Sequence, residues 1–264
     1  MAGGTRNNFA AFGCGAVIGT LGGLIGLGGA EFRLPLLIGL FRFAALEAVI
    51  LNKAVSLVVV AAALLFRTGT VSFETIVSQW DVVINLLAGS LAGAWYGSGW
   101  AMRLKSEVLC RTIAVLLIFI SVTLLFGHNA AGLGHPLLLG YVQVIAGIIA
   151  GVFIGIVASL LGVAGGELLI PTLVLLFGCD IKLAGSLSLA VSLPTMIVGF
   201  SRYTQDASFA VLGQNRLFLA VMVIGSLGGA FIGGLLLSIT SAAILLPLLA
   251  TILMLSAVKV WRHG

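Results

Sequence analysis

Apolar residues occur in ten runs along the chain, and short polar or glycine-rich stretches separate these runs. The alternation of polar and apolar residues that the strands of a membrane barrel require is absent. The longer runs reach the roughly 20 residues that a helix needs to cross the hydrocarbon of a bilayer. The pattern therefore predicts an all-α integral membrane protein. The expected segments are 9–27, 31–43, 46–66, 81–101, 108–126, 137–162, 168–178, 184–201, 216–237 and 241–260.

A glycine-rich motif occurs twice, as GTLGGLIGLGGAEFRLPLL over 19–37 and as GIVASLLGVAGGELLIPTL over 155–173. A constant offset of 136 residues superposes the two copies without a gap, and it also superposes 89–91 on 225–227. A register kept over that length predicts a duplicated unit. The duplication divides the chain into a cytoplasmic N-terminus over 1–8, a first membrane repeat over 9–127, a linker over 128–136, a second membrane repeat over 137–260 and a tail over 261–264.

Each glycine-rich motif lies between a long apolar segment and a short one, 31–43 in the first repeat and 168–178 in the second. The short segments cannot span alone. We therefore expect each motif to be a turn, either in a re-entrant hairpin or between two broken helices that cross unequally. The alternative treats 9–43 and 137–178 as single long helices.

The distribution of lysine and arginine favours the turn, because these residues gather on the cytoplasmic side of membrane proteins. Eight simple spans would put six on one side and five on the other, whereas a reversal at both motifs puts nine against two. The nine are Arg6, Arg42, Arg103, Lys105, Arg111, Arg202, Arg216, Lys259 and Arg262, and the two are Arg67 and Lys182. We therefore expect both termini in the cytoplasm and two inverted repeats, a plan that many secondary transporters share.

Composition agrees with a membrane protein and narrows the function. With 61% hydrophobic and 8% charged residues and a mean hydropathy of +1.26, the chain cannot cover a water-facing surface. The net charge of +5 is spread over loops and termini, so it reports topology and no nucleic-acid partner. All three histidines, His128, His135 and His263, lie outside the expected spans, so we expect no metal, no cofactor and no Ser/His enzyme.

The motif itself has the chemistry of an anion site. Glycines leave main-chain N–H groups unpaired, and lipid penalises such groups, so the turn must be buried in protein or line a watery cavity. We expect Pro35 and Pro171 in the first turn of each short helix, whose N-terminus then directs its N–H groups and positive dipole end at the turn. The alternative is that the glycines only allow close helix packing.

Glu31 and Glu167 are the carboxylates of the two motifs, and a carboxylate in hydrocarbon must be protonated, paired or in contact with a cavity. They could carry protons that are coupled to transport, control the occupancy of an anion site, or cap the turn. Arg33, whose repeat-mate is Leu169, could be the fixed counter-charge of an anion, pair with Glu31, or reach the interface.

Polar residues of the following segments complete the candidate site. Asn52 and Ser56, and symmetrically Ser188 and Ser192, are spaced by four and share a helical face, where they could bind a ligand or join helices. The candidate substrate-binding residues are Gly28, Gly29, Ala30, Glu31, Arg33, Asn52, Ser56, Gly165, Gly166, Glu167, Ser188 and Ser192. We expect Lys53 to reach the headgroups unless its face points inward, and Arg202 and Tyr203 to be interfacial anchors.

The duplicated motifs GLIGLGGAEFRLPLL and LLGVAGGELLIPTLVLLFG resemble the sulfite exporter TauE/SafE family, also called the 4-toluene sulfonate uptake permease family. The resemblance covers essentially the whole chain. It implies movement of sulfur-containing or organic anions, such as sulfite, sulfoacetate, sulfolactate or thiosulfate, across the bacterial inner membrane. Cargo and direction remain open, and Ala30 and Ala164 stand where the family motif has glycine.

Together, the residues and the resemblance predict a secondary transporter, expected to be an exporter, that binds a small sulfur oxyanion or sulfonate centrally between the two glycine-rich turns. Its expected partners are the anion, the lipid bilayer and protons carried by Glu31 and Glu167, and a homo-oligomer is left open. The alternatives are an anion channel and a carrier of another organic anion. A different class of function is an intramembrane enzyme that uses Glu31 and Glu167 as a carboxylate pair, and we do not favour it.

Overall fold

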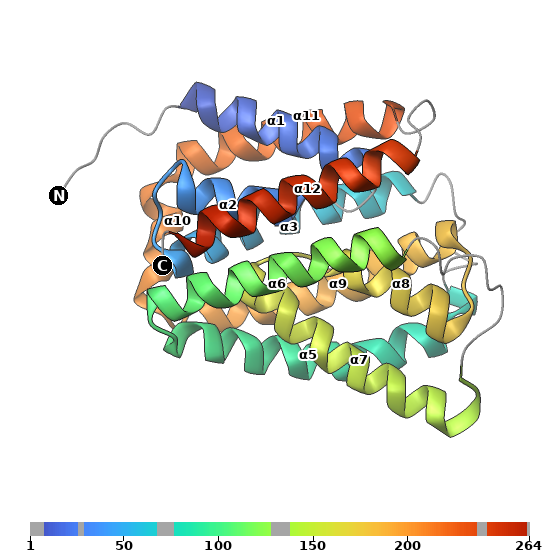
Figure 1. Cartoon of the computed structure of the whole chain (residues 1–264). Coiled ribbons are helices and arrows are strands. Elements are labelled where there is room, and N and C mark those ends of the chain that lie inside the picture. Colours follow the sequence, from blue (N-terminus) through green and yellow to red (C-terminus); the bar gives the residue numbers. More distant parts are fainter. Residues whose placement is uncertain (1–7, 26–28, 68–76, 128–137, 237–241, 263–264) are drawn as a thin grey trace.

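The computed structural model describes residues 8–25, 29–67, 77–127, 138–236 and 242–262, and these residues form helices joined by loops, without a strand (Figure 1). The helices are α1 (Asn8–Ile25), α2 (Ala30–Gly39), α3 (Ala45–Arg67), α5 (Trp80–Arg103), α6 (Ser106–Gly127), α7 (Gly140–Leu161), α8 (Gly166–Phe177), α9 (Ile181–Tyr203), the 3-10 helix η2 (Ala207–Phe209), α10 (Ala210–Gln214), α11 (Arg216–Leu236) and α12 (Ala242–Trp261). Each of the ten expected segments is a helix, and among the elements of the described residues the short η2 and α10 were not expected. The prediction of an all-α protein is confirmed.

Several helices are suited to span a bilayer. Within the described residues, four stretches are long and apolar enough by length and composition: Ala45–Leu64, Gly140–Leu161, Leu183–Tyr203 and Arg216–Gly233. A chain with that many apolar helices is a multi-pass membrane protein.

Helices of the two halves are interleaved. The offset of 136 residues relates α1 to α7, α5 to α11 and α3 to α9. In the fold, α1 packs against α11 and α5 packs against α7, so each of these pairs joins one half to the other. The repeat relates α1 to α7 and α11 to α5, so it turns the α1–α11 pair into the α7–α5 pair. Helix α3 packs against its own repeat-mate α9. The two halves therefore form one structure and not two separate domains.

Close contact within the α1–α11 and α5–α7 helix pairs depends on glycine. A Cβ atom added to Gly19 in α1 would run into the main-chain carbonyl oxygen of Ser226 in α11. Its repeat-mate Gly155 in α7 stands in the same way against the carbonyl oxygen of Ser90 in α5. Small residues at such positions let helix backbones approach, which is the main way in which helices associate in lipid.

Replacing Gly19 or Gly155 by alanine should lower the thermal stability of the purified protein in detergent, because the two helices must move apart. Inserting a methylene into a close-packed contact costs about 1–3 kcal/mol. Gly13→Ala is the matched control in α1, because a Cβ there meets nothing within 4 Å. Melting temperatures of Gly19→Ala and Gly155→Ala equal to that of Gly13→Ala would contradict this packing.

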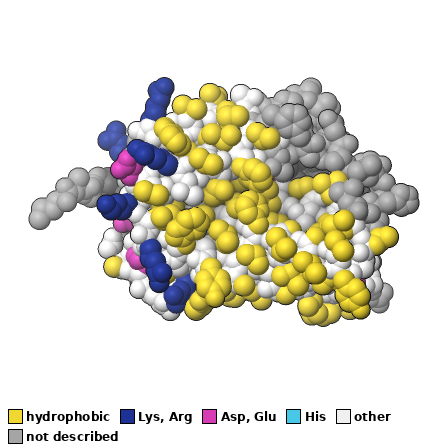
Figure 2. Space-filling view, turned by 60° about the horizontal axis from the view of Figure 1, so that its bottom comes forward, with side chains coloured by type: hydrophobic (Ala, Val, Ile, Leu, Met, Phe, Trp, Pro, Cys, Tyr) yellow, Lys and Arg dark blue, Asp and Glu magenta, His cyan; other side chains and the backbone are white. Residues whose placement is uncertain are grey.

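The bundle has one basic end. In Figure 1, α1 begins and α12 ends toward the same end of the molecule, at the left. Figure 2 keeps this end at the left and shows lysine and arginine side chains gathered there, whereas the rest of the visible described surface is largely hydrophobic. We call it the basic end, and it comprises the ends of α5, α9 and α12 and the starts of α6 and α11, with Arg103, Lys105, Arg111, Arg202, Arg216, Lys259 and Arg262.

Candidate functional site

Both glycine-rich motifs interrupt a helix in the same way. Gly29 precedes α2 with φ of 68° and Gly165 precedes α8 with φ of 80°, so both N-caps are left-handed. A left-handed conformation costs other residues about 1–2 kcal/mol, which explains glycine at both places. Gly162, which ends α7, is also left-handed, with φ of 65°. The break between helices is therefore as expected, and the alternative of single long helices over 9–43 and 137–178 is wrong.

The helix starts present main-chain donors to the interior. No side chain caps α2 or α8. In α2, the N–H groups of Phe32 and Arg33 donate to the Gly29 carbonyl oxygen at 3.3 Å each, and in α8 the corresponding N–H groups donate to Gly165. The N–H groups of Ala30 and Glu31 come before these bonds, at the positive end of the helix dipole. Such a start can accept an anion.

The position of the prolines differs from the expectation. Pro35 and Pro171 are the sixth residues of α2 and α8, not first-turn residues, because each helix begins directly after its left-handed glycine. A proline cannot donate to the carbonyl four residues before it, and that residue is Glu31 in α2 and Glu167 in α8. The two prolines therefore remove the usual helical donor from the carbonyl of each glutamate.

The structure brings the two glutamates together. Glu31 is fully buried and Glu167 is 3% exposed. The carboxyl groups are neighbours, close enough for a hydrogen bond between the two side chains when one of them carries a proton. The four carboxyl oxygens form no hydrogen bond of good geometry with another described residue, and the main-chain N–H of each glutamate lies near its own carboxyl group. Two neighbouring carboxylates cannot both ionise cheaply in the interior, so the arrangement is suited to hold a proton.

Arg33 lies in the interior and is fully buried. Its guanidinium donates through Nη1 to Asn52 Oδ1 at 3.2 Å and to Ser56 Oγ at 3.1 Å, and through Nη2 to Ser226 Oγ at 3.4 Å. All three partners are neutral, and Nε has none. Glu31 is near enough to interact electrostatically, yet it forms no ion pair with Arg33 within 4 Å. Of the three expectations for Arg33, pairing with Glu31 and reaching the interface are wrong.

Asn52 connects the two motifs. Its Nδ2 donates to the Ala30 carbonyl at 2.9 Å, in the first motif, and to the Leu161 carbonyl at 3.0 Å, in the second motif at the end of α7. Its Oδ1 accepts from Arg33. Both donors and one of the two acceptor positions of its amide are thus used to hold α2, α7 and the guanidinium in place.

Asn52→Leu should destabilise the fold strongly, because the substitution keeps the volume but leaves two carbonyls and one Arg33 donor unpaired. Hydrogen bonds between membrane helices are worth about 0.6–1.7 kcal/mol each, so three of them amount to about 2–5 kcal/mol. The melting temperature in detergent measures the loss. Asn85→Leu is the control, because Asn85 donates only one such bond, to Val144 at 3.2 Å. We expect the melting temperature to fall further for Asn52→Leu than for Asn85→Leu, and an equal fall would contradict this role of Asn52.

The second half has serines at the positions of Asn52 and Ser56 but no cation at the position of Arg33. Leu169 stands in place of Arg33 and is buried. Ser188 and Ser192 are also buried, but Ser188 donates to the Gly185 carbonyl at 2.9 Å and Ser192 Oγ has no partner. Gly166 is buried in the first turn of α8. Of the remaining candidates, Gly28 lies outside the described residues.

Two expectations at the interface are wrong. Lys53 is 1% exposed and does not reach the headgroups, because its face of α3 points to the interior. Tyr203 is fully buried and donates to the Ser159 carbonyl at 2.8 Å, so it is no interfacial anchor. Arg202 is placed as expected, half-buried at the basic end with its guanidinium 4.4 Å from the centre of the Trp95 ring.

Comparison with known proteins agrees with this architecture. A family model described as "Sulfite exporter TauE/SafE" matches residues 11–260. The chain belongs to this family. The TauE/SafE chain is also 25% identical over 239 residues to "Probable membrane transporter protein YunE" of Bacillus subtilis (strain 168), a match that covers 83% of this chain and 84% of the relative. No solved structure matched.

Membership fixes the class of function. TauE/SafE proteins are membrane transporters and not enzymes, so this chain is a membrane transporter, and the buried carboxyl pair is not an enzyme's. The resemblance expected from the two motifs is thereby confirmed.

Ser226 is a residue of the TauE/SafE chain that we did not single out from the sequence. Ser226 is uncharged, and its hydroxyl oxygen accepts a hydrogen bond from Arg33, so the bond joins the two halves. The signal was present, because Ser226 aligns with Ser90 in the repeat. Ser90 is likewise buried and shares a hydrogen bond of 2.7 Å with the hydroxyl of Thr195.

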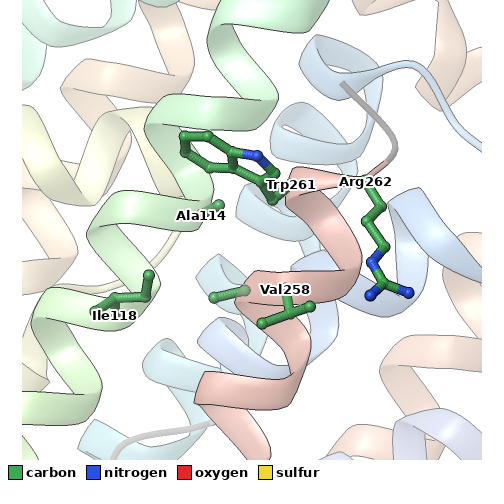
Figure 3. A pocket seen from close by; sticks show the side chains of 6 residues that line it. Ala114, Ile118, Val258, Trp261 and Arg262 are labelled. Atoms are coloured by element: carbon green, nitrogen blue, oxygen red, sulfur yellow. The ribbon is translucent and has the colours of Figure 1, made fainter.

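A surface pocket of the TauE/SafE chain lies apart from these residues, between α6 and α12 (Figure 3). Its lining residues are Ala114, Ile118, Ala257, Val258, Trp261 and Arg262. Figure 3 shows the Arg262 guanidinium on the far side of α12 from the Trp261 ring. The pocket wall is therefore apolar, and it has neither the carboxyls nor the converging donors that an anion site needs.

Proposed function

We propose that this chain is a secondary carrier of small sulfur-containing anions, such as sulfite, sulfonates or sulfoacetate, and that it exports them across the bacterial inner membrane. The observation that carries the proposal is the buried Arg33 guanidinium, which has only neutral partners. A buried cation that no carboxylate contacts within 4 Å is costly. A bound anion supplies the missing charge.

The donors around Arg33 suit a small oxyanion. A guanidinium offers a planar fork that matches two oxygens of a sulfonate or sulfite, and its Nε–H is available. The start of α2 adds the N–H groups of Ala30 and Glu31, and Gly29 allows a ligand to come close to the main chain. The candidate residues of the second half, Gly165, Gly166, Ser188 and Ser192, form the opposing wall of the proposed site, with Gly28 in the first motif.

Glu31 and Glu167 are the proposed proton carriers. A negative ligand next to Arg33 lies close to the carboxyl pair, so ionised carboxylates would repel it. Protonation of the pair therefore favours binding, and release of the anion favours release of the proton. This linkage moves the anion and the proton in the same direction. With a divalent anion the loaded carrier keeps one negative charge of the cargo, which the inside-negative membrane potential drives outward.

The proposed transport cycle uses two inverted repeats, 9–127 and 137–260, that move against each other around the central site. Support comes from the interleaved pairs α1–α11 and α5–α7, which the repeat offset exchanges. The gathering of lysine and arginine at the end where α1 begins and α12 ends supports cytoplasmic termini.

Uptake into proteoliposomes tests the function. Sulfite, thiosulfate, sulfoacetate and taurine are offered at two pH gradients, with protein-free liposomes as the control. We expect saturable uptake of the anions that responds to the gradient. Linear, gradient-independent flux would indicate a channel instead. Acetate is offered in parallel as a sulfur-free carboxylate. Saturable uptake of acetate with none of the sulfur anions transported would assign another organic anion.

A further inference from the structure

Lys53 is a second buried cation, and the proposed central site does not use it. It follows Asn52 on α3, is 1% exposed, and donates from Nζ to Ser159 Oγ at 3.2 Å. Its ammonium also lies 5.5 Å from the centre of the Tyr203 ring. An ammonium has three donors, and this is the one hydrogen bond that Lys53 makes within the described residues.

No acid balances this charge. The chain has eight acidic residues, and those among the described residues form no ion pair with Lys53 within 4 Å. The last turn of α7, which contains Ser159, offers the negative end of a helix dipole. That end amounts to about half a charge, so it offsets only part of the ammonium. A buried, half-compensated cation has the electrostatics of an anion site.

Further polar groups converge on the same point from three helices. A Cβ atom added to Gly199 of α9 would meet Lys53 Nζ, Ser159 Oγ of α7 and Ser98 Oγ of α5. Ser98 donates to the Gly199 carbonyl at 3.0 Å, and Ser159 donates to the Ala94 carbonyl at 3.1 Å. The hydroxyls are thus held in place, and glycine at 199 keeps the space beside the ammonium free of a side chain.

The cluster lies toward the basic end. Ser98 stands five residues before the end of α5 at Arg103, and Gly199 stands four before the end of α9 at Tyr203. At 1.5 Å per residue these distances are about 8 Å and 6 Å along the helices. Asn52, the partner of Arg33, immediately precedes Lys53 in α3. The cluster therefore lies near the basic end, beside the Arg33 site.

We propose that Lys53 forms a second binding station for the transported small oxyanion, on its way between the central site and the basic end, and that Ser98 and Ser159 turn their hydroxyl hydrogens from the Gly199 and Ala94 carbonyls to the anion when it binds. This inference rests on the proposed function. A station of this kind attracts the anion from one side and then passes it to Arg33. Lys53 sets the affinity for anion that arrives at the basic end and does not act on anion from the other side.

The proposal is tested by comparing the KM for thiosulfate that enters from the basic end with the KM for thiosulfate that enters from the opposite end. Thiosulfate uptake is measured in inside-out and right-side-out membrane vesicles, which present opposite ends of the carrier. Lys53→Met should raise KM by about tenfold for thiosulfate presented at the basic end, the loss of one charge-assisted bond, and by less than about twofold from the other end. Lys53→Arg, which keeps the charge, should stay near the unchanged protein. Lys105→Met, an exposed cation at the basic end, is the control.

Ser98→Ala keeps the test valid if Lys53→Met does not fold, because it leaves the ammonium and its bond to Ser159 in place. We expect a one-sided rise of KM by about threefold. Equal KM changes at both ends, or a Lys53→Arg variant as impaired as Lys53→Met, would overturn the station alone. Absence of saturable thiosulfate uptake by the unchanged protein from either end would overturn the proposed function, and the station with it.

Discussion

Arg33→Gln should reduce the uptake of sulfite and thiosulfate by at least about a hundredfold at low concentration, while the protein still folds. Glutamine can still donate to Asn52 and Ser56, so the interior hydrogen bonds of the guanidinium are partly replaced. What is lost is the positive charge and the fork. Each hydrogen bond to a charged group contributes about 1.5–3 kcal/mol, so two of them account for a loss of this size.

The matched variants separate charge from geometry. Arg33→Lys keeps the charge without the planar fork, and we expect it to fall between the unchanged protein and Arg33→Gln. Lys105→Gln removes an exposed cation at the basic end and should leave uptake within about twofold. A folded Arg33→Gln protein, with a normal melting temperature and unchanged uptake, would remove Arg33 from the site.

Glu31→Gln and Glu167→Gln should each uncouple transport from the proton gradient. One pH unit acting on one coupled proton is worth about 1.4 kcal/mol, which is a tenfold change in accumulation. We expect the unchanged protein to show this response and either variant to show less than about twofold. Thiosulfate is the probe, because its own charge stays constant over the neutral pH range and the measured response then belongs to the protein.

Protonation of the pair admits the anion, so initial uptake should rise as pH falls on the side from which thiosulfate enters. The glutamine variants should lose this dependence but keep anion exchange, because an amide resembles a protonated carboxyl. Glu107→Gln is the control, since Glu107 is an exposed acid paired with Arg111 at 2.5 Å. A full pH response in both Glu31→Gln and Glu167→Gln would show that other groups carry the proton.

Much of the fold could be predicted because apolar length and glycine placement decide it. The ten helices follow from apolar runs, the longer of which match bilayer thickness, and the breaks follow from Gly29 and Gly165, whose left-handed conformation few other residues adopt. Asn52 and Ser56 were placed on one face by their spacing, and the structure brings both to Arg33.

The inward direction of Lys53 and Tyr203 could not be predicted, because helices that are apolar on all sides carry no polar face to indicate which side is buried. A long stem allows lysine to reach either the headgroups or the interior. The approach of Glu31 to Glu167 likewise depends on how the two halves pack, which the repeat register alone does not specify. The position of Pro35 within α2 depended on where the left-handed glycine ended the turn.

Counterflow measures directly whether this protein is a carrier whose anion binds at Arg33. Proteoliposomes are loaded with unlabelled sulfite under anaerobic conditions and diluted into trace radiolabelled sulfite, with the unchanged protein and Arg33→Gln in parallel. We expect a transient accumulation of label above its equilibrium level with the unchanged protein and none with Arg33→Gln. Label that only approaches equilibrium in both, or an equal overshoot in both, would contradict it.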